Sequence, residues 1–539
     1  MKYPIGIQTF DQIIERGFVY VDKTDLVYSL ATEGKIYFLS RPRRFGKSLL
    51  LSTLRAYFEG KKELFAGLKI DTLEKDWHVH RVFHFDFNGI NFTVPGALSR
   101  ILDSMLSEWE QEYSIVTDIR PEYGLRFSRI LQAAADQTGR GAVVLVDEYD
   151  KPLLDVLEKD PALLEENREM LKAFYSVFKQ ADASLRFVFL TGVTKFSQVS
   201  VFSGFNQPKD ISMYGEYEAL CGITEEELHT QFAEPIQEMA ASEGCTEEEI
   251  RQRLKRHYDG YHFSKEMTDI YNPFSLLNAF DCKDIRDYWF SSGTPSYLIR
   301  LMNHFHEGID ELTSKYYLPD EFINYKADIE YPLPMIYQSG YLTIKDYDKD
   351  SNLFLLDFPN NEVKSGFLAM VATNYLQCKA PLESWMVRAV FALKRGELEE
   401  FRKMLTSFLA SIPYTMRRKD NEPERERYFH YTFYLLLRLM SVYTVLTEKE
   451  QSEGRVDCIV ETPHYVYIFE FKLDGTATEA LRQIDEKGYA RPYEADSRKV
   501  VKVGVNFSSQ TGTIQEWETQ VTYFCIYNSI LIFNCKSAD

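Results

Sequence analysis

The stretch YFLSRPRRFGKSLLL, residues 37–51, ends in the way that phosphate-binding loops end. Its Gly46-Lys47-Ser48 closes the pattern G-x-x-x-x-G-K-[ST], in which a loop leads into a helix. The same pattern requires a glycine five places before Gly46, where this chain has Arg41. At this point three interpretations are open: a working ATP site, a relic of one, or a chance match.

The flanking residues have the pattern that such a loop needs. Residues 36–40, IYFLS, form a short apolar run with β-branched and aromatic side chains, which predicts a buried strand. From Ser48 onward a helix is predicted, because apolar side chains recur every four residues at Leu50, Leu54 and Phe58. A strand, a basic loop and a helix in this order direct a helix N-terminus at a phosphate group.

Each residue of the Gly-Lys-Ser triplet then has a predicted role. Gly46 would let the backbone approach the anion, Lys47 would reach the β- and γ-phosphates, and Ser48 would hold Mg²⁺. The predicted cofactors are therefore ATP and Mg²⁺. A bare triplet is common by chance, but a triplet between a predicted strand and an amphipathic helix is much less so.

The second half of such a site should be an apolar strand that ends in carboxylates, and GAVVLVDEYD, residues 141–150, supplies it. Asp147 would hold Mg²⁺ through water, and Glu148 would polarise the attacking water. The simpler alternative is a strand that ends in a solvated acidic turn. The order of the two motifs along the chain favours the catalytic interpretation.

More strands are predicted to complete a parallel sheet. VFHFDF, residues 82–87, follows the first helix, and RFVFLTG, residues 186–192, follows a helical segment at 162–180. Strands that alternate with helices indicate crossover connections. Thr191, at the tip of its strand, is placed to sense the γ-phosphate. We expect the triplet and the acidic pair at the carboxyl ends of adjacent or next-adjacent strands, where open α/β sheets bind ligands.

Several blocks resemble the AAA-ATPase-like domain of a large prokaryotic family. They are YVDKT (20–24), RPRRFGKSLL (41–50), VLVDEYDKPL (144–153) and LTGVTKFSQVSVFSGFNQPKDIS (190–212), extended by YDGYHFS and YNPFSLLNAF (258–280). In that family RPRRFGKS is the usual loop, so the resemblance implies that Arg41 is a family trait. It also implies a nucleotide-binding set of Arg43, Arg44, Phe45, Gly46, Lys47, Ser48, Leu49, Asp147 and Thr191.

The basic residues of the loop have two interpretations. Arg43 and Arg44 would add positive charge beside the phosphates, as an arginine finger does. The alternative is a solvated basic turn. An arginine finger can also arrive from a neighbouring copy, so a homo-oligomer is among the expected partners.

The second informative stretch is EGRVDCIVETPHYVYIFEFKLDG, residues 453–475, which predicts two strands around a turn. Glu470 and Lys472 stand two residues apart in an apolar strand and therefore share a face. They form either a structural ion pair or part of the D-x(n)-E-x-K site of a metal-dependent nuclease. Asp457 joins that face only if the loop has even length or a bulge, for example with Asp457 opposite Ile468.

The residues after this hairpin predict a helix at 476–493 and strands at 500–508 and 522–528. Through GRVD, FEFK and the glutamine of ALRQI, the segment resembles the PD-(D/E)XK nuclease superfamily. The resemblance implies that Asp457 and Glu470 bind Mg²⁺, that Lys472 polarises the water or steadies the phosphorane charge, and that Gln483 completes the catalytic set. Glu426 resembles the helical acid that often completes the metal site.

Composition limits the choice of partners and compartment. The net charge is −19 and the pI about 5.2, so nucleic acid, with DNA expected, must be met by a local basic patch. Arg417, Arg418, Lys419 and Arg425 could form that patch, although their composition also suits a solvated linker. The seven scattered cysteines favour a reducing compartment. No apolar run reaches membrane-spanning length, so we expect a cytoplasmic protein without a membrane partner.

These observations together predict an α/β chain with three parts. Residues 1–215 would form a P-loop ATPase domain of the AAA or ASCE type, 216–415 a mainly helical lid and mixed region, and 416–539 a PD-(D/E)XK nuclease-like domain. Within the lid, Thr224 followed by three glutamates predicts a helix cap. The expected function is an ATPase coupled to a Mg²⁺-dependent DNA nuclease, in defence against foreign DNA or in recombination. The alternative is a regulatory or scaffold ATPase whose nuclease-like domain only binds nucleic acid or a protein.

Overall fold

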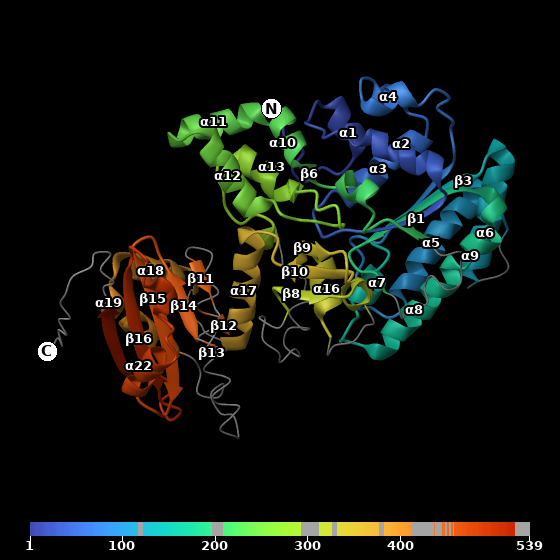
Figure 1. Ribbon diagram of the computed structural model, residues 1–539. Coiled ribbons are helices and arrows are strands. Elements are labelled where there is room, and N and C mark those ends of the chain that lie inside the picture. The colour runs from blue at the N-terminus through green and yellow to red at the C-terminus, as the bar shows by residue number, and fades with distance from the viewer. Residues whose placement is uncertain are drawn as a thin grey trace. The chain divides into compact units, whose positions relative to one another are not determined.

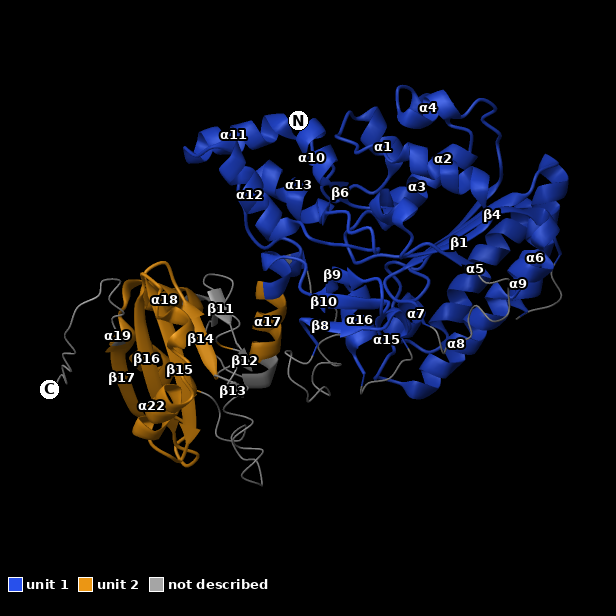
Figure 2. Cartoon of the chain, viewed as in Figure 1, with its two compact units in different colours: residues 1–364 blue, residues 365–539 orange. Residues whose placement is uncertain are grey.

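The structure divides into two compact units, residues 1–364 and residues 365–539 (Figure 2). The computed structural model describes residues 1–116, 122–196, 208–292, 312–325, 331–376, 382–411 and 457–522, with 436, 445–447, 450–451 and 454–455. The boundary predicted at 415/416 lies outside the described residues, and the one at 215/216 falls within the first unit. The three-part division therefore stays a prediction. Among the described helices, none is long and apolar enough to cross a membrane.

A five-stranded sheet is the centre of the first unit (Figure 1). Its strands are β1 (Ile36–Ser40), β2 (Val82–Asp86), β3 (Ala142–Asp147), β4 (Leu185–Gly192) and β5 (Lys209–Asp210). Their order is β2-β3-β4-β1-β5, and every neighbouring pair is parallel. The predicted parallel sheet is confirmed, and because β4 lies between β1 and β3, the two motifs follow next-adjacent strands.

Helices cover both faces of this sheet (Figure 1). The helices in question are α1 (Phe10–Glu15), α2 (Thr24–Glu33) and α3 (Lys47–Phe58) on one side, and α5 (Ala97–Glu112), α6 (Tyr123–Thr138) and α8 (Pro161–Tyr175) on the other. Phe85 of β2 packs at 5.1–5.2 Å, between ring centroids, on Trp109, Phe127 and Phe174. On the opposite face Phe187 of β4 packs at 4.9 Å on Phe58. Alternating strand side chains thus supply two aromatic cores.

A helical group follows the sheet. It consists of α10 (Glu225–Gln231), α11 (Ala233–Glu243), α12 (Glu247–Tyr258) and α13 (Pro273–Cys282). Leu228, Ile236, Leu254 and Leu276 form its core. Thr224 caps α10 in a capping box with Glu227, which confirms the cap predicted for this residue.

The remaining elements of the first unit are short. They are η1 (Lys62–Phe65), α4 (Lys69–Leu73), α7 (Lys151–Leu154), α9 (Val177–Gln180), η2 (Asp182–Ser184), η4 (Gly215–Leu220), β6 (Ile223–Thr224), β7 (Ile270–Tyr271), η5 (Phe290–Ser292), β8 (Lys315–Tyr317), α15 (Pro319–Ile323), α16 (Leu333–Gln338), β9 (Thr343–Asp348) and β10 (Leu353–Asp357). Strands β8, β10 and β9 form a small antiparallel sheet. After it comes α17 (Asn361–Leu376), which begins in the first unit and ends in the second.

The second unit is built on a mixed sheet of order β11-β14-β15-β16-β17 (Figure 1). Its elements are α18 (Leu382–Arg395), α19 (Leu398–Ser411), β11 (Val445–Thr447), β12 (Glu450–Gln451), β13 (Gly454–Arg455), β14 (Cys458–Glu461), β15 (Tyr465–Leu473), α22 (Ala477–Glu486), η7 (Arg491–Tyr493), β16 (Lys499–Phe507) and β17 (Ile514–Thr522). Ile484 of α22 packs with Ile468 on one face, and Phe401 of α19 approaches Phe469 on the other. The predicted hairpin and the strand after it are present, and the predicted helix ends at Glu486 instead of at residue 493.

One strand of the second unit is absent from the sequence-based prediction. Residues 514–522, IQEWETQVT, form β17 and pair antiparallel with β16. Six of the nine side chains in this segment are polar or charged, a composition that also suits a solvated loop. The strand predicted at 522–528 lies, beyond Thr522, outside the described residues.

A buried acid in the first turn of α17 leads to a pH-dependent prediction. Glu362 is 1% exposed, and burial raises its pKa to about 7, with Asp287 adding to the shift and His257 opposing it. A raised carboxyl pKa contributes stability that is fully present at low pH and is lost as the pH rises through the folded-state value.

Because Glu362→Gln cannot ionise, we expect the variant to gain stability relative to wild type between pH 5 and pH 7.5, by about 3 kcal/mol at most. Thermal unfolding of both proteins across this range measures the difference. A constant offset between them would contradict the prediction.

Candidate functional site

Arg41 is a buried anchor of the loop between β1 and α3. It is 1% exposed, and its Nη1 donates to the carbonyls of Ser40 and Ser212 at 2.9 and 2.8 Å. Its Nη2 donates to the carbonyls of Tyr217 and Glu218 at 3.3 and 3.5 Å. Burial lowers the pKa of Arg41. The side chain that replaces the usual glycine therefore ties the loop to residues 212–218.

The rest of the loop winds through left-handed backbone. Arg44 has φ 67° and Gly46 φ 94°, and only glycine adopts the latter without strain. Between them Phe45 is buried, with its ring centroid 4.8 Å from that of Tyr261 and 5.5 Å from that of Phe263. Phe45 is therefore a structural anchor of the loop.

The loop's other basic residues are exposed. Arg43 and Arg44 both reach solvent, and the guanidinium of Arg44 lies 5.2 Å from the centroid of the Phe274 ring. Leu49 lies half-buried in the first turn of α3. The two arginines are therefore free to contribute charge around an anion at the helix start.

The Gly-Lys-Ser triplet and the acidic end of β3 meet at the carboxyl ends of the parallel strands. Ser48 Oγ donates to Asp147 Oδ2 at 2.6 Å, and Thr191 Oγ1 donates to Asp147 Oδ1 at 2.8 Å. The three predicted residues therefore form one cluster contributed by α3, β3 and β4. A hydroxyl and a carboxylate this close offer the hard oxygen ligands that Mg²⁺ prefers.

Lys47 and Glu148 are the charged pair of this cluster. Lys47 Nζ donates to the carbonyls of Arg41 and Pro42 at 2.8 and 3.0 Å. Burial lowers the pKa of Lys47, and the charges of Glu148 and Asp147 oppose the shift. Burial raises the pKa of Glu148, against the charge of Lys47. Glu148 also has φ 51°, an unusual conformation that marks functional sites in many proteins.

Asp150 is a further residue of this site that the sequence analysis left unassigned. It is 1% exposed, and its Oδ2 accepts hydrogen bonds from the backbone N–H groups of Val193 and Thr194 at 3.0 and 2.6 Å. Burial raises the pKa of Asp150 to about 7. In the sequence, only its place in the acidic run after β3 pointed to a role for Asp150. Its hydrogen bonds show that it holds the segment after β4.

The hairpin of the second unit brings the predicted nuclease residues to one face. Glu461 pairs with Val466 around an even-length connection, residues 462–465, as the shared face requires. The predicted pairing of Asp457 with Ile468 is wrong, because Ile459 pairs with Ile468. In the same register Asp457 lies opposite Glu470, so the side chain of Asp457 is still on the face that carries Glu470 and Lys472.

The carboxylates and the lysine converge there. Asp457 Oδ2 accepts a hydrogen bond from the backbone N–H of Phe471 at 2.8 Å. Lys472 Nζ lies 3.6 Å from Glu470 Oε1 and donates to Gln483 Oε1 at 2.7 Å. Gln483 Nε2 in turn donates to Glu470 Oε1. All four predicted residues thus belong to one pocket beside α22.

Glu470 is the most unusual member of this pocket. It is 1% exposed, and burial, followed by the charge of Asp457, raises its pKa to about 8. Its Oε2 is buried without a hydrogen-bond partner among the residues that the structure describes. An unpartnered buried carboxylate oxygen beside a second carboxylate fits a divalent cation held by oxygen ligands.

The described residues supply two acids to this pocket, and within them no group of three or more His, Cys, Asp or Glu side chains is arranged for a metal. Glu426, predicted as a further acid, lies outside the described residues, as do Arg417, Arg418, Lys419 and Arg425.

Tyr489, in this pocket, is the second residue, after Asp150, that the sequence analysis missed. It is 1% exposed and its hydroxyl is hydrogen-bonded to Gln483, with the charges of Glu470 and Asp457 nearby. A tyrosine six residues after the glutamine was its only signal in the sequence. Its position indicates that it orients the Gln483 amide.

A P-loop sheet with a Ser-Asp-Thr cluster and a mixed sheet with an Asp-Glu-Lys-Gln pocket define an ATPase-like protein that carries a nuclease-like unit. Comparison with known proteins agrees. A family model described as a predicted AAA-ATPase matches residues 4–202, and one for the PD-(D/E)XK nuclease superfamily matches residues 424–517.

A protein of Azotobacter chroococcum mcd 1, described as "Uncharacterized protein in vnfD 5'region", is 36% identical over 522 residues. The alignment covers 95% of this chain and 98% of that protein. The chain belongs to the family of proteins that join a predicted AAA-ATPase domain to a PD-(D/E)XK nuclease-superfamily domain.

Proposed function

We propose that this protein is an ATPase whose second unit is a Mg²⁺-dependent DNA endonuclease. The observation that carries the nuclease half is the convergence of Asp457, Glu470, Lys472 and Gln483, with one buried Glu470 oxygen lacking a hydrogen-bond partner among the described residues. Burying such charges costs several kcal/mol unless they pair or bind a metal. A purely structural ion pair leaves that oxygen unexplained.

In the proposed reaction the acids, the lysine and the glutamine have different tasks. Asp457 and Glu470 would hold Mg²⁺, which lowers the pKa of bound water and stabilises charge on a phosphoryl oxygen. Lys472, held by Gln483 at 2.7 Å, is positioned to orient the attacking water or to offset negative charge as the phosphodiester is attacked. Tyr489, hydrogen-bonded to Gln483, would help to hold the amide of Gln483 in place.

In the first unit, Lys47 would exchange its bonds to the loop carbonyls for bonds to the phosphates of ATP. Ser48 and Asp147 would hold Mg²⁺, with Thr191 fixing the carboxylate. Glu148 would accept the proton of the attacking water, a role that its raised pKa favours.

The proposed biological setting rests on the combination of the two proposed activities. A DNA-cutting unit joined to a nucleotide-dependent one suits defence against foreign DNA or recombination, in the cytoplasm, where free cysteines persist. A homo-oligomer would let an arginine of one copy approach the ATP of the next. The alternative, a regulatory or scaffold ATPase whose second unit only binds nucleic acid or a protein, has in its favour that only two acids of the pocket are described.

Plasmid cleavage with Mg²⁺, with and without ATP, tests the proposal. Wild type should nick or linearise the plasmid, and EDTA should stop it. Lys472→Ala should lower the rate by about 10²–10³-fold, because a preorganised charge that stabilises the transition state is lost. Arg482→Ala is the matched control, since Arg482 lies on α22 with a largely exposed side chain. Retarded DNA migration without cleavage would support the alternative.

A further inference from the structure

The indole of Trp289 contacts the phosphate loop. Trp289 is 5% exposed, and its Nε1–H donates to the carbonyl of Arg43 at 3.0 Å. Its ring packs on Tyr341 with a centroid distance of 5.1 Å. Arg43 precedes Arg44, whose backbone is left-handed. The hydrogen bond from Trp289 therefore fixes the loop at the point where the chain turns.

Glu362 holds Trp289 in place. Its Oε1 accepts from the backbone N–H of Trp289 at 2.6 Å, and its Oε2 accepts from Ser275 Oγ at 2.7 Å. Both carboxylate oxygens are therefore used. A continuous series of hydrogen bonds thus leads from the loop carbonyl of Arg43, through Trp289, to the first turn of α17.

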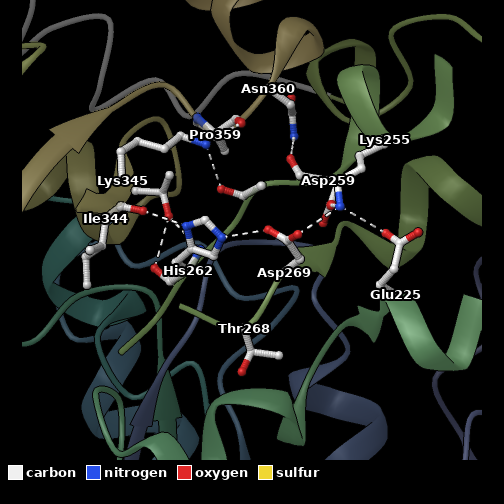
Figure 3. A network of polar contacts seen from close by, with 12 residues as sticks. Glu225, Lys255, Asp259, His262, Thr268, Asp269, Ile344, Lys345, Pro359 and Asn360 are labelled. Atoms are coloured by element: carbon white, nitrogen blue, oxygen red, sulfur yellow. Dashed lines mark hydrogen bonds and ion pairs between the residues drawn. The ribbon is translucent and has the colours of Figure 1, made fainter. Parts of the chain in front are cut away.

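A second connection reaches the same turn through the segment 259–263. Asn360 Nδ2 donates to the carbonyl of Asp259 at 2.8 Å, and Lys345 Nζ donates to the carbonyls of Gly260 and Pro359 at 3.0 and 2.8 Å (Figure 3). A Cβ on Gly260 would lie 2.4 Å from the Pro359 oxygen, so glycine is needed for this approach.

The segment is fixed on its other side as well. His262 lies between the carbonyl of Ile344 and Asp269, at 2.7 and 2.8 Å, and Lys255 binds the same carboxylate at 2.9 Å (Figure 3). Phe45 of the phosphate loop packs on Tyr261 of this segment. Segment 259–263 therefore contacts both the phosphate loop and the start of α17.

We propose that Trp289 and Glu362 are positioning residues that hold the phosphate loop in its nucleotide-binding form and couple its occupancy to the first turn of α17. The proposal rests on the proposed ATP site and adds its regulation. Since α17 continues past Lys364 into the second unit, the helix that would respond to ATP is shared by both units.

Steady-state ATPase kinetics give the first test. Trp289→Phe keeps an aromatic ring on Tyr341 but removes the indole donor, so KM for ATP should rise about five- to tenfold, with kcat within about twofold. Glu362→Met should behave similarly, whereas Glu362→Gln, which still accepts from Trp289, should stay near wild type.

Trp385→Phe is the matched control. Trp385 is also buried and its indole N–H donates to the carbonyl of Met404 at 3.0 Å, but it lies in the second unit. Its KM for ATP should not change. The thermal unfolding temperature of each variant shows whether a raised KM comes from an unfolded protein or from the loss of the hydrogen bond alone.

Hydrogen–deuterium exchange with a nonhydrolysable ATP analogue and Mg²⁺ gives the decisive readout. In wild type the analogue should slow exchange of the amides at 361–368 at least threefold, with residues 398–411 as an unaffected reference. At saturating analogue, Trp289→Phe should lose this protection while Trp385→Phe keeps it. Equal protection in Trp289→Phe and wild type would overturn the coupling and leave the ATP site intact. A wild-type protein that binds no analogue would overturn both proposals.

Discussion

Changing Asp457 to asparagine or alanine is expected to abolish DNA cleavage while ATP turnover stays near the wild-type rate. Asp457 sits level with Glu470 in the hairpin register, and its charge is the second cause of the raised pKa of that residue. In the proposed site both carboxylates would hold Mg²⁺, and the transition-state stabilisation that the ion would provide is worth several kcal/mol. Cleavage should therefore fall at least about 10³-fold.

The two substitutions separate chemistry from structure. Asp457 also accepts a hydrogen bond from the backbone N–H of Phe471. Alanine would leave this N–H group unpaired, whereas the amide oxygen of asparagine can still accept the hydrogen bond. Asp457→Asn should thus keep the fold and lose the activity. Glu486→Ala, on α22 with a side chain 68% exposed, is the control for a lost acid elsewhere in the unit.

ATP turnover is measured on the same preparations, because Asp457 belongs to the second unit and the phosphate loop to the first. Asp457→Asn protein that cuts plasmid at the wild-type rate would make the scaffold alternative the better interpretation.

Lys47→Ala is expected to remove measurable ATP binding, and Glu148→Gln to keep binding and slow hydrolysis by about 10²–10⁴-fold. Lys47 is buried at the start of α3 with its ammonium bonded to carbonyls of the loop, from which it can turn to phosphate oxygens. Glu148 is the carboxylate whose raised pKa suits a general base. Glutamine keeps its size and removes its basicity.

Binding of radiolabelled ATP and phosphate release measure the two effects separately. Lys62→Ala, which removes an exposed lysine of η1, is the control for a lost positive charge. Undiminished ATP binding by Lys47→Ala would refute the assignment of the loop. Normal turnover by Glu148→Gln would move the role of base to another residue.

Local sequence patterns predicted the elements of both sites well. Strands β1 and β3 and helix α3 are built from apolar residues whose spacing is legible without tertiary contacts, and the predicted limits agree closely with the structure. For the hairpin, the alternation of side chains along a strand gave only the condition for a shared face, an even-length loop or a bulge. The actual partner of Asp457 could not be deduced, since register depends on how the whole sheet packs.

What sequence could not supply were contacts between distant residues. Asp150 binds the segment after β4, Trp289 binds a loop 246 residues earlier, and Tyr489 matters only because α22 turns Gln483 toward it. Strand β17 was missed for a related reason: its stability comes from pairing with β16, while most of its own side chains are polar or charged.

The buried side chain of Arg41 bears on how nucleotide-binding chains are found and engineered. Replacing it with glycine would make the loop match the familiar motif more closely, but would remove four hydrogen bonds to backbone carbonyls. It would also leave a space over Phe263, whose ring centroid lies 4.1 Å from the guanidinium carbon. In this chain a buried side chain holds the loop in place where the familiar motif has a glycine. A motif search that requires this glycine would pass over the loop, and restoring the glycine would remove the hydrogen bonds that hold it.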